Sequence, residues 1–168
     1  MQQTTSLSDD EITSRLQQYF STGSPLFAYL GLTIEAASST GIDARFTPRP
    51  ELAGASAEAS PFGGAITTVL DTLFGLAIMI NLGAPMPIAT INLRTDFIEP
   101  SSPSSQVSGE LKFSARCISI DKDIARAEGT CIEPVTEAII AHSYAAFAIG
   151  TRGPILAPEE YGDVAGDG

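Results

Sequence analysis

The chain has 168 residues, of which 43% are apolar and 17% are charged. These values predict one globular domain with a hydrophobic core and exclude a disordered chain. The formal net charge of −11 argues against nucleic-acid binding, which needs a basic surface. One His and two Cys leave almost no material for a metal site, and the N-terminus lacks the pattern of a signal peptide. We therefore expect a metal-free protein in the cytoplasm.

The first part of the chain predicts a helix followed by a hairpin. In residues 8–20, Ser8 can cap a helix, acidic residues follow in the first turn, and apolar residues recur at helical spacing. Residues 25–30 are apolar and predict one or two helical turns. Residues 32–46 alternate about a turn and predict two strands. The long Pro-, Gly-, Ala- and Ser-rich loop at 47–61 is typical of functional loops.

Residues 63–82 form an unusually apolar segment with Asp71 near its middle. A helix that is apolar nearly all round is either buried or membrane-spanning. The carboxylate in its middle and the lack of basic flanks argue against a membrane span. We therefore predict a central helix wrapped by a sheet.

Four strand-like runs follow this helix, and turn signals separate them. They predict an antiparallel meander, so the whole chain is expected to be an α+β domain. The runs cover residues 88–98, 107–118, 124–132 and 138–149. The expected organisation is an N-terminal helix and linker (1–24), the main domain (25–152) and a frayed acidic tail (153–168).

The two cysteines are expected to be reduced thiols on strands. If the second and third strands of the meander turn at residues 120 and 121, Cys117 faces about residue 124 and Cys131 faces about residue 110. The pair then does not meet, and a disulfide is not expected. Neither thiol has an evident activating base, which argues against a Cys nucleophile.

The segment from Pro61 to Ala77 carries a resemblance to a known family. A Gly-Gly pair is followed by Asp eight residues after the first Gly, and then by Gly-Leu-Ala. This pattern resembles the central-helix signature of hotdog-fold acyl-CoA thioesterases of the PaaI-like type, in the 4-hydroxybenzoyl-CoA thioesterase superfamily. Agreement in order and spacing extends over about residues 25–150, in segments 30–32, 90–100, 121–128 and 141–149.

The resemblance implies a hotdog fold, an antiparallel sheet wrapped around a long helix, in dimers or dimers of dimers with active sites at the dimer interface. It implies hydrolysis of acyl-CoA, with coenzyme A as part of the substrate and no separate cofactor. Asp71 corresponds to the family's general base or nucleophile. The backbone N–H of Gly63 or Gly64 corresponds to the group that polarises the thioester carbonyl, and Thr90 to the residue that positions water.

Asp71 and the glycines also suggest chemistry without the family. A carboxylate on an apolar helix is partly desolvated, which makes it a better base, and no cation lies within helical reach. The alternative is a structural Asp satisfied by hydroxyls such as that of Thr67. First-turn N–H groups at Gly63 and Gly64 can bind an oxyanion, although Gly-Gly also suits a tight turn.

The spacing of these groups argues for two chains. Eight helical residues span about 12 Å, which is too far for Gly63 and Asp71 of one helix to serve one thioester carbon. A site shared between two antiparallel helices removes this difficulty, so the hypothesis requires a dimer. A strictly monomeric, fully active enzyme would contradict it.

Two positions depart from the family pattern. Phe62 stands where relatives often have His, and Ala57 stands where they often have Asn. The hydrogen bonds of those residues are missing or supplied otherwise, and Glu58 is a candidate stand-in. Phe62, with Phe74 and Phe97, is a candidate for the wall of an acyl pocket. The alternative for all three is ordinary core packing.

Lys122 and Arg126 are candidates for binding the phosphates of coenzyme A, and Lys122 matches a family Arg. The alternative for each is a solvated surface charge. His142, the only histidine, lies on the last strand and is interpreted as structural.

Three other functions stay open. The first is a non-catalytic acyl-CoA-binding hotdog protein, which the missing His and Asn favour. The second is a hotdog dehydratase or hydratase, although such enzymes usually pair His with an acid. The third is a structural or interaction domain, for which Asp71 has no role. The expected partners are a small-molecule acyl-CoA and a second copy of the chain, with no nucleic acid or membrane.

Overall fold

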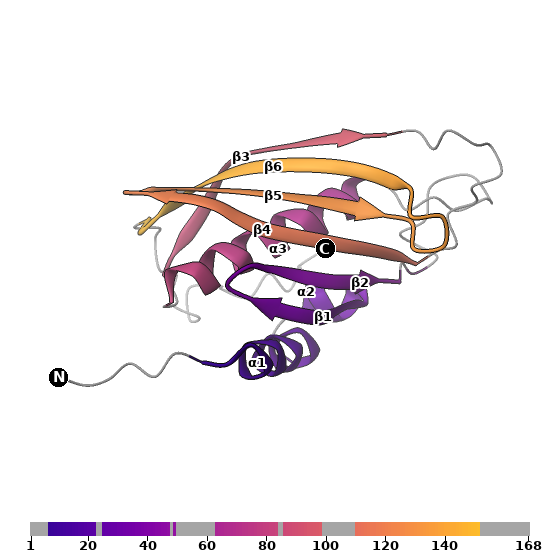
Figure 1. Cartoon of the computed structure of the whole chain (residues 1–168), viewed down its shortest axis with the longest axis horizontal. Coiled ribbons are helices and arrows are strands. Elements are labelled where there is room, and N and C mark those ends of the chain that lie inside the picture. Colours follow the sequence, from indigo (N-terminus) through magenta and orange to yellow (C-terminus); the bar gives the residue numbers. More distant parts are fainter. Residues whose placement is uncertain are drawn as a thin grey trace, which may run out of the picture.

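The computed structural model describes residues 7–22, 25–47, 49, 63–83, 86–98 and 110–151. In these parts an antiparallel sheet wraps around one long helix, and a shorter helix lies beside the edge of the sheet (Figure 1). The elements are α1 (Asp9–Thr22), α2 (Pro25–Leu30), β1 (Leu32–Ser38), β2 (Gly41–Phe46), α3 (Gly63–Leu82), β3 (Ile88–Phe97), β4 (Leu111–Asp121), β5 (Ile124–Ile132) and β6 (Ile139–Ile149). The predicted α+β class is confirmed.

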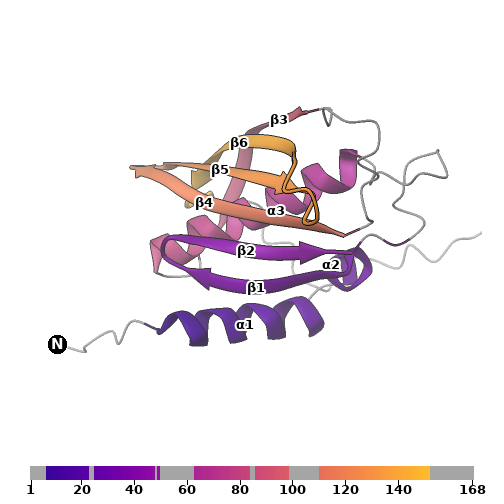
Figure 2. The same cartoon turned by 45° about the vertical axis from the view of Figure 1, so that its right-hand side comes forward.

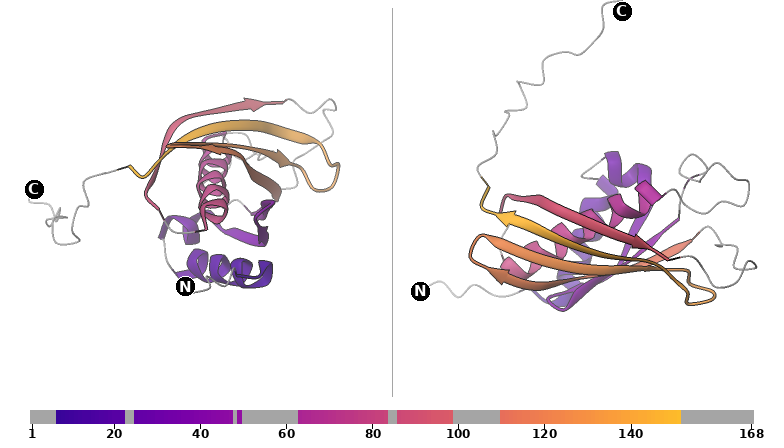
Figure 3. Two further views of the ribbon diagram at one scale, coloured as in Figure 1. Left: turned by 60° about the vertical axis from the view of Figure 1, so that its left-hand side comes forward. Right: turned by 90° about the horizontal axis from the view of Figure 1, so that it is seen from above.

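The six strands form one sheet in the order β1-β2-β4-β5-β6-β3, so the predicted four-strand meander is wrong. β3 pairs with β6 instead of with β4, and β4 pairs with β2. Neighbours in sequence are the usual partners, but the connection from β3 to β4 is long enough to cross the sheet. The pairing of β2 with β4 joins the first hairpin to the later strands, and the resulting curved sheet encloses α3 (Figure 3).

The core lies between α3 and the concave face of this sheet. Ten of the 20 residues of α3 are buried, and the inward residues of β4, β5 and β6 pack against them. α3 is the one helix in the described ranges that is long and apolar enough to span a membrane. The sheet covers this helix, because α3 contacts β4, β5, β3 and β6. The prediction of a buried central helix is confirmed.

The β4–β5 hairpin turns two residues later than predicted. β4 extends to Asp121, and Lys122, with a φ of 52°, takes the left-handed conformation that a tight turn requires. A β-bulge between Cys117 and Ser119 further shifts the register, so that Cys117 lies opposite Ala127. Cys131 correspondingly lies opposite Phe113 rather than residue 110.

Both cysteines are free thiols, as expected. Burial raises the pKa of Cys131 to about 12. Burial also raises the pKa of Cys117, against the weaker opposing effect of a backbone contact with Ser119. Both thiols are therefore protonated at neutral pH and poor nucleophiles.

α1 closes the β1 edge of the sheet (Figure 2). Thr13 Oγ1 accepts a hydrogen bond from the backbone N–H of Ala37 at 2.9 Å, and Gln17 donates to the carbonyl of Ile34 at 2.9 Å. The helix begins with a reciprocal cap, in which Glu11 accepts from the Ser8 N–H and the Glu11 N–H donates to Ser8 Oγ. Polar side chains of α1 thus bond to the backbone of an edge strand.

Candidate functional site

One stripe of α3 faces the edge strand β3. The residues of the stripe are four apart, which places them on one side of the helix. They meet β3 in reverse order, so that helix and strand run antiparallel: Gly63 with Phe97, Thr67 with Thr95, Asp71 with Thr90 and Gly75 with Ile88. We call these four pairs the α3–β3 seam.

The seam brings together two of the residues that the sequence singled out. Thr90 Oγ1 donates a hydrogen bond to Asp71 Oδ1 at 2.9 Å. The Asp71 side chain is half-buried, and Thr90 is exposed. A β-bulge follows Thr90, and its partner on β6 is the buried Phe147. Thr90 therefore lies on the inner face of the sheet, within reach of α3.

Asp71 has no cationic partner among the residues that the structure describes. The ion pairs found within the described residues involve other carboxylates. Its second oxygen, Oδ2, has no hydrogen-bond donor among these residues. The alternative partner from the sequence, Thr67, donates instead to Thr95 Oγ1 at 3.4 Å. One carboxylate oxygen is thus held in place while the other is available as an acceptor.

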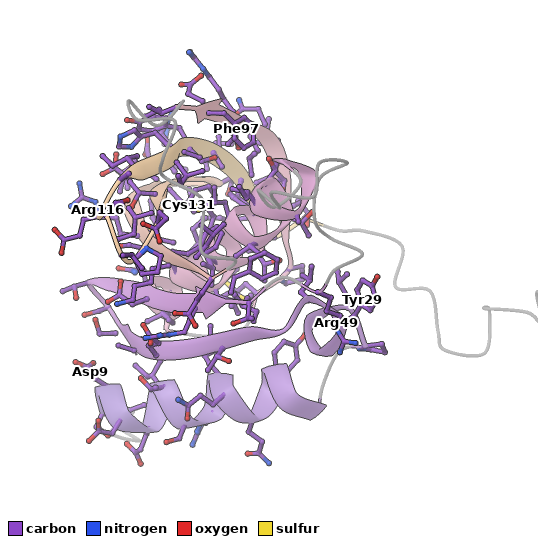
Figure 4. All side chains as sticks on the ribbon, turned by 90° about the vertical axis from the view of Figure 1, so that its right-hand side faces the viewer. Asp9, Tyr29, Arg49, Phe97, Arg116 and Cys131 are labelled. Atoms are coloured by element: carbon purple, nitrogen blue, oxygen red, sulfur yellow. The ribbon has the colours of Figure 1, made fainter. Side chains whose placement is uncertain are left out.

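The start of α3 forms the other end of the seam. Gly63 lies under the ring of Phe97, and a Cβ atom at Gly63 would come within 3.0 Å of that ring. Gly64 is exposed. First-turn N–H groups have no acceptor within their own helix. Figure 4 shows Phe97 close to this first turn, so an aromatic ring flanks the predicted oxyanion donors.

A chain of hydroxyls joins the middle of the seam to the core. Thr67 donates to Thr95, Thr95 lies 3.1 Å from Ser143 Oγ, and Ser143 donates to the carbonyl of Arg94 at 2.8 Å. Ser143 is completely buried. Sequence reasoning missed Thr95 and Ser143 because they are 48 residues apart in the chain and meet only through the pairing of β3 with β6.

The candidate acyl-pocket residues occupy different places. Phe97 is 53% exposed on the seam, whereas Phe74 has no exposed surface. The Phe74 ring packs so closely on Gly129 that a Cβ there would come within 2.8 Å of it. Phe74 is therefore a core residue in this chain. Phe62 and Glu58, with most of the predicted loop, lie outside the described residues.

The candidate phosphate-binding residues do not lie at the seam. Arg126 lies on the outer face of the sheet, on β5 opposite Ala146 of β6, while Lys122 lies at the tip of the β4–β5 hairpin. Their role in binding stays a prediction. Arg116, which pairs with Glu128, projects from the same outer face (Figure 4).

His142 also lies on the outer face, because its neighbours Ala141 and Ser143 are buried on the inner one. It lines a hollow of about 360 Å³ together with Arg116, Glu128 and Tyr144. The sheet separates this hollow from Asp71. In the part of the chain that the structure describes, no three His, Cys, Asp or Glu side chains are grouped so that they could hold a metal ion.

Comparison with known proteins assigns the chain to a known fold. No family model matches the chain, and no curated protein matches it. Similar solved structures include a protein from Shewanella oneidensis related to the thioesterase superfamily, with 20% identity, a TM-score of 0.68 and coverage of 84% of this chain and 97% of that one. A thioesterase from Haemophilus influenzae is 17% identical, with a TM-score of 0.63 and coverage of 82% and 89%.

A third structure, from Pseudomonas aeruginosa, is 26% identical, with a TM-score of 0.62 and coverage of 82% of this chain and 98% of that one. These likenesses extend over nearly the whole of the other chains. Together with the six-stranded sheet around α3, they define the chain as a hotdog-fold protein, similar to structures of the thioesterase superfamily.

Proposed function

We propose that this protein hydrolyses acyl-CoA thioesters as a dimer, with Asp71 as the catalytic carboxylate. The hydrogen bond from Thr90 to Asp71 carries the proposal. It fixes a half-buried carboxyl side chain on the stripe of the core helix that faces the edge strand β3. The thioesterase-superfamily likeness of the fold supports a thioester as the substrate class.

The reaction needs a base, an oxyanion site and a leaving group. Asp71 takes a proton from water, or attacks the carbonyl itself, while first-turn N–H groups at Gly63 or Gly64 stabilise the oxyanion. The thiol of coenzyme A then leaves. Each donor to an oxyanion is typically worth about 10²- to 10³-fold in rate.

The dimer follows from the length of the seam. Asp71 and Gly63 are eight residues apart, about 12 Å along the helix, so one chain cannot apply both groups to one carbon. A two-fold axis across β3 reverses the seam of the second copy. Asp71 then shares a site with the first turn of the partner's helix.

The β3 edge suits such pairing. Ile91, Phe97 and Ile98 are 54%, 53% and 41% exposed there. An apolar edge with free backbone groups is a template for another strand. Antiparallel pairing of two β3 strands would bury these side chains and continue the sheet. Lys122 or Arg126 would meet the phosphates of coenzyme A, and we place the reaction in the cytoplasm.

The first test measures thiol release from acetyl-, hexanoyl-, palmitoyl- and benzoyl-CoA, with wild type and Asp71→Asn side by side. We expect turnover by the wild type and a fall of at least about 10²-fold in the variant, the size of losing a general base. Asp96→Asn is the matched control, because Asp96 pairs with Arg94 on the outer face.

The other possible results of this test distinguish the alternative functions. Equal losses in Asp71→Asn and Asp96→Asn would contradict a catalytic role for Asp71. Tight binding of an acyl-CoA by a folded dimer without turnover would indicate the non-catalytic binding protein. Hydration of an enoyl-CoA would indicate the hydratase alternative.

A further inference from the structure

The hydroxyl chain in the seam has a fixed direction. A carbonyl oxygen only accepts, so Ser143 gives its single proton to Arg94. Thr95 must then donate to Ser143, and Thr67 donates to Thr95. Each hydroxyl has one proton, and all three protons point from the seam towards the core. Thr67 therefore has only acceptor lone pairs left for anything that binds in the seam.

Thr67 differs in this respect from the other threonines of α3. Thr68 donates to the Gly64 carbonyl at 2.8 Å and Thr72 to the Thr68 carbonyl at 2.9 Å, the usual bond of a helical Thr to its own backbone. Thr67 bonds across to the sheet instead. The structure thus orients one of three neighbouring hydroxyls towards the edge strand.

Asp71, one helical turn further along α3, can likewise only accept hydrogen bonds. Thr90 gives its proton to Asp71 Oδ1, so the carboxylate and Thr67 are two acceptors on one stripe. Side chains four residues apart on a helix have Cβ atoms about 5–6 Å apart. The side-chain oxygens extend beyond these Cβ atoms, and a water molecule that donates two hydrogen bonds of about 2.8 Å can bridge two such oxygens at about 4.5 Å from each other.

We propose that Thr67 is a further catalytic residue, which accepts a hydrogen bond from the attacking water while Asp71 accepts the other. This inference rests on the proposed thioesterase function. With both protons of the water engaged, its lone pair points away from α3, towards a thioester carbonyl in the seam. Ser143 is a positioning residue, since it acts through Thr95 and touches no substrate.

The reaction balances with these groups. The water oxygen forms a bond to the carbonyl carbon as Asp71 takes one proton. The second proton stays on the oxygen, bonded to Thr67, and becomes the proton of the acid product. The C–S bond then breaks, and the proton on Asp71 passes to the departing sulfur. Acid and free thiol are the products, and Asp71 is again a carboxylate.

The experiment compares Thr67→Val with Thr68→Val in the full-length dimer, on the best thioester of the acyl-CoA panel. Both changes replace the hydroxyl by a methyl group on the same helix. We expect Thr67→Val to lower kcat about 10-fold with KM within about 2-fold, because the lost contact belongs to the attacking water. Thr68→Val should leave both constants within about 2-fold, and Thr67→Ser should restore most of the activity.

Several results would overturn this role for Thr67. They are equal kcat values for Thr67→Val and Thr68→Val, a change in KM alone, or no rescue by Thr67→Ser. Single-turnover hydrolysis in ¹⁸O-labelled water should label only the released acid, and label on Asp71 would also overturn it. If Thr67→Val does not fold, Thr67→Ala and Ser143→Ala take its place, and both should lower kcat while KM stays unchanged.

The two proposals fail in different ways. If Asp71→Asn abolishes turnover and Thr67→Val matches its control, the thioesterase proposal stands and the role of Thr67 is wrong. If the wild type releases no thiol from any thioester, the thioesterase proposal fails first, and the role of Thr67 fails with it.

Discussion

The two edges of the sheet differ in what covers them. At the β1 edge, α1 lies alongside the strand, and Thr13 and Gln17 bond to its backbone. At the β3 edge no described element covers the strand, and Ile91 and Phe97 are more than half exposed. Both edges belong to one sheet, but only the second borders the stripe of α3 that carries Asp71.

This difference indicates how one sheet can both avoid and use strand pairing. An exposed edge invites association, and natural proteins block the edges that should stay single. Here the blocked edge is remote from the seam, whereas the open edge forms one wall of it. We infer that the open edge is kept for a second copy of the chain.

The largest effect is expected from placing a charge on the open edge. Ile91→Lys introduces a cation at a residue that is 54% exposed on β3. Because charged edge residues oppose strand pairing, we expect a monomer with thiol release reduced at least about 10²-fold, the size of losing an oxyanion donor. Light scattering after size-exclusion chromatography measures the assembly, and the acyl-CoA assay measures activity.

Ile118→Lys is the matched control for this variant. Ile118 is 51% exposed on β4, away from the β3 edge. It should leave both assembly and activity unchanged. A fully active monomer of Ile91→Lys would disprove the shared site, and an unaffected dimer would place the interface elsewhere.

A smaller effect is expected from uncovering the closed edge. Thr13→Val and Gln17→Leu each remove a side-chain hydrogen bond to the β1 backbone. A bond of this kind contributes about 0.5–1.5 kcal/mol, so the double variant should lose about 1–3 kcal/mol of the free energy of unfolding. Urea denaturation measures the loss. Turnover of the folded protein should not change, and a fall in kcat at unchanged stability would contradict the assignment of α1 to edge protection.

The smallest effect is expected from the cap of α1. Hydrogen bonds from Ser8 lower the pKa of Glu11 below its ordinary value of 4.5. A lowered pKa means that the ionised form stabilises the native state at pH values above 4.5, and that this stability is lost as the pH falls through the lowered pKa. Wild type should therefore unfold at a higher temperature than Glu11→Gln at pH 7, with the difference vanishing in acid. A difference that persists below the pKa would contradict this origin.

Much of the fold could be predicted from local patterns. The apolar length of residues 63–82 predicts a buried helix, and alternation predicts the strands. The order of the strands could not be predicted, because β3 pairs with β6, the last strand in the chain, rather than with its neighbour in sequence. The late hairpin turn was missed because it needs Lys122 in a left-handed conformation, which favours Gly and is uncommon for Lys.

The candidate site, like the fold, could be predicted from the sequence only in part. Sequence resemblance singled out Asp71 and Thr90 but could not supply their contact, because they lie 19 residues apart on different elements. Local pattern also gave no sign that Thr67 points to the sheet while Thr68 bonds to its own helix. The two hydroxyls differ because Thr67 lies on the side of α3 that faces β3, whereas Thr68 does not.

The sequence by itself determined the helix, the strands and the carboxylate in an apolar segment, because these depend on residue type and spacing along the chain. Tertiary structure decided which edge of the sheet is closed, which is open, and which hydroxyls meet Asp71. Those properties depend on strand order and on the rotation of α3 against the sheet. Both are set by packing between residues far apart in the chain, which local periodicity does not record.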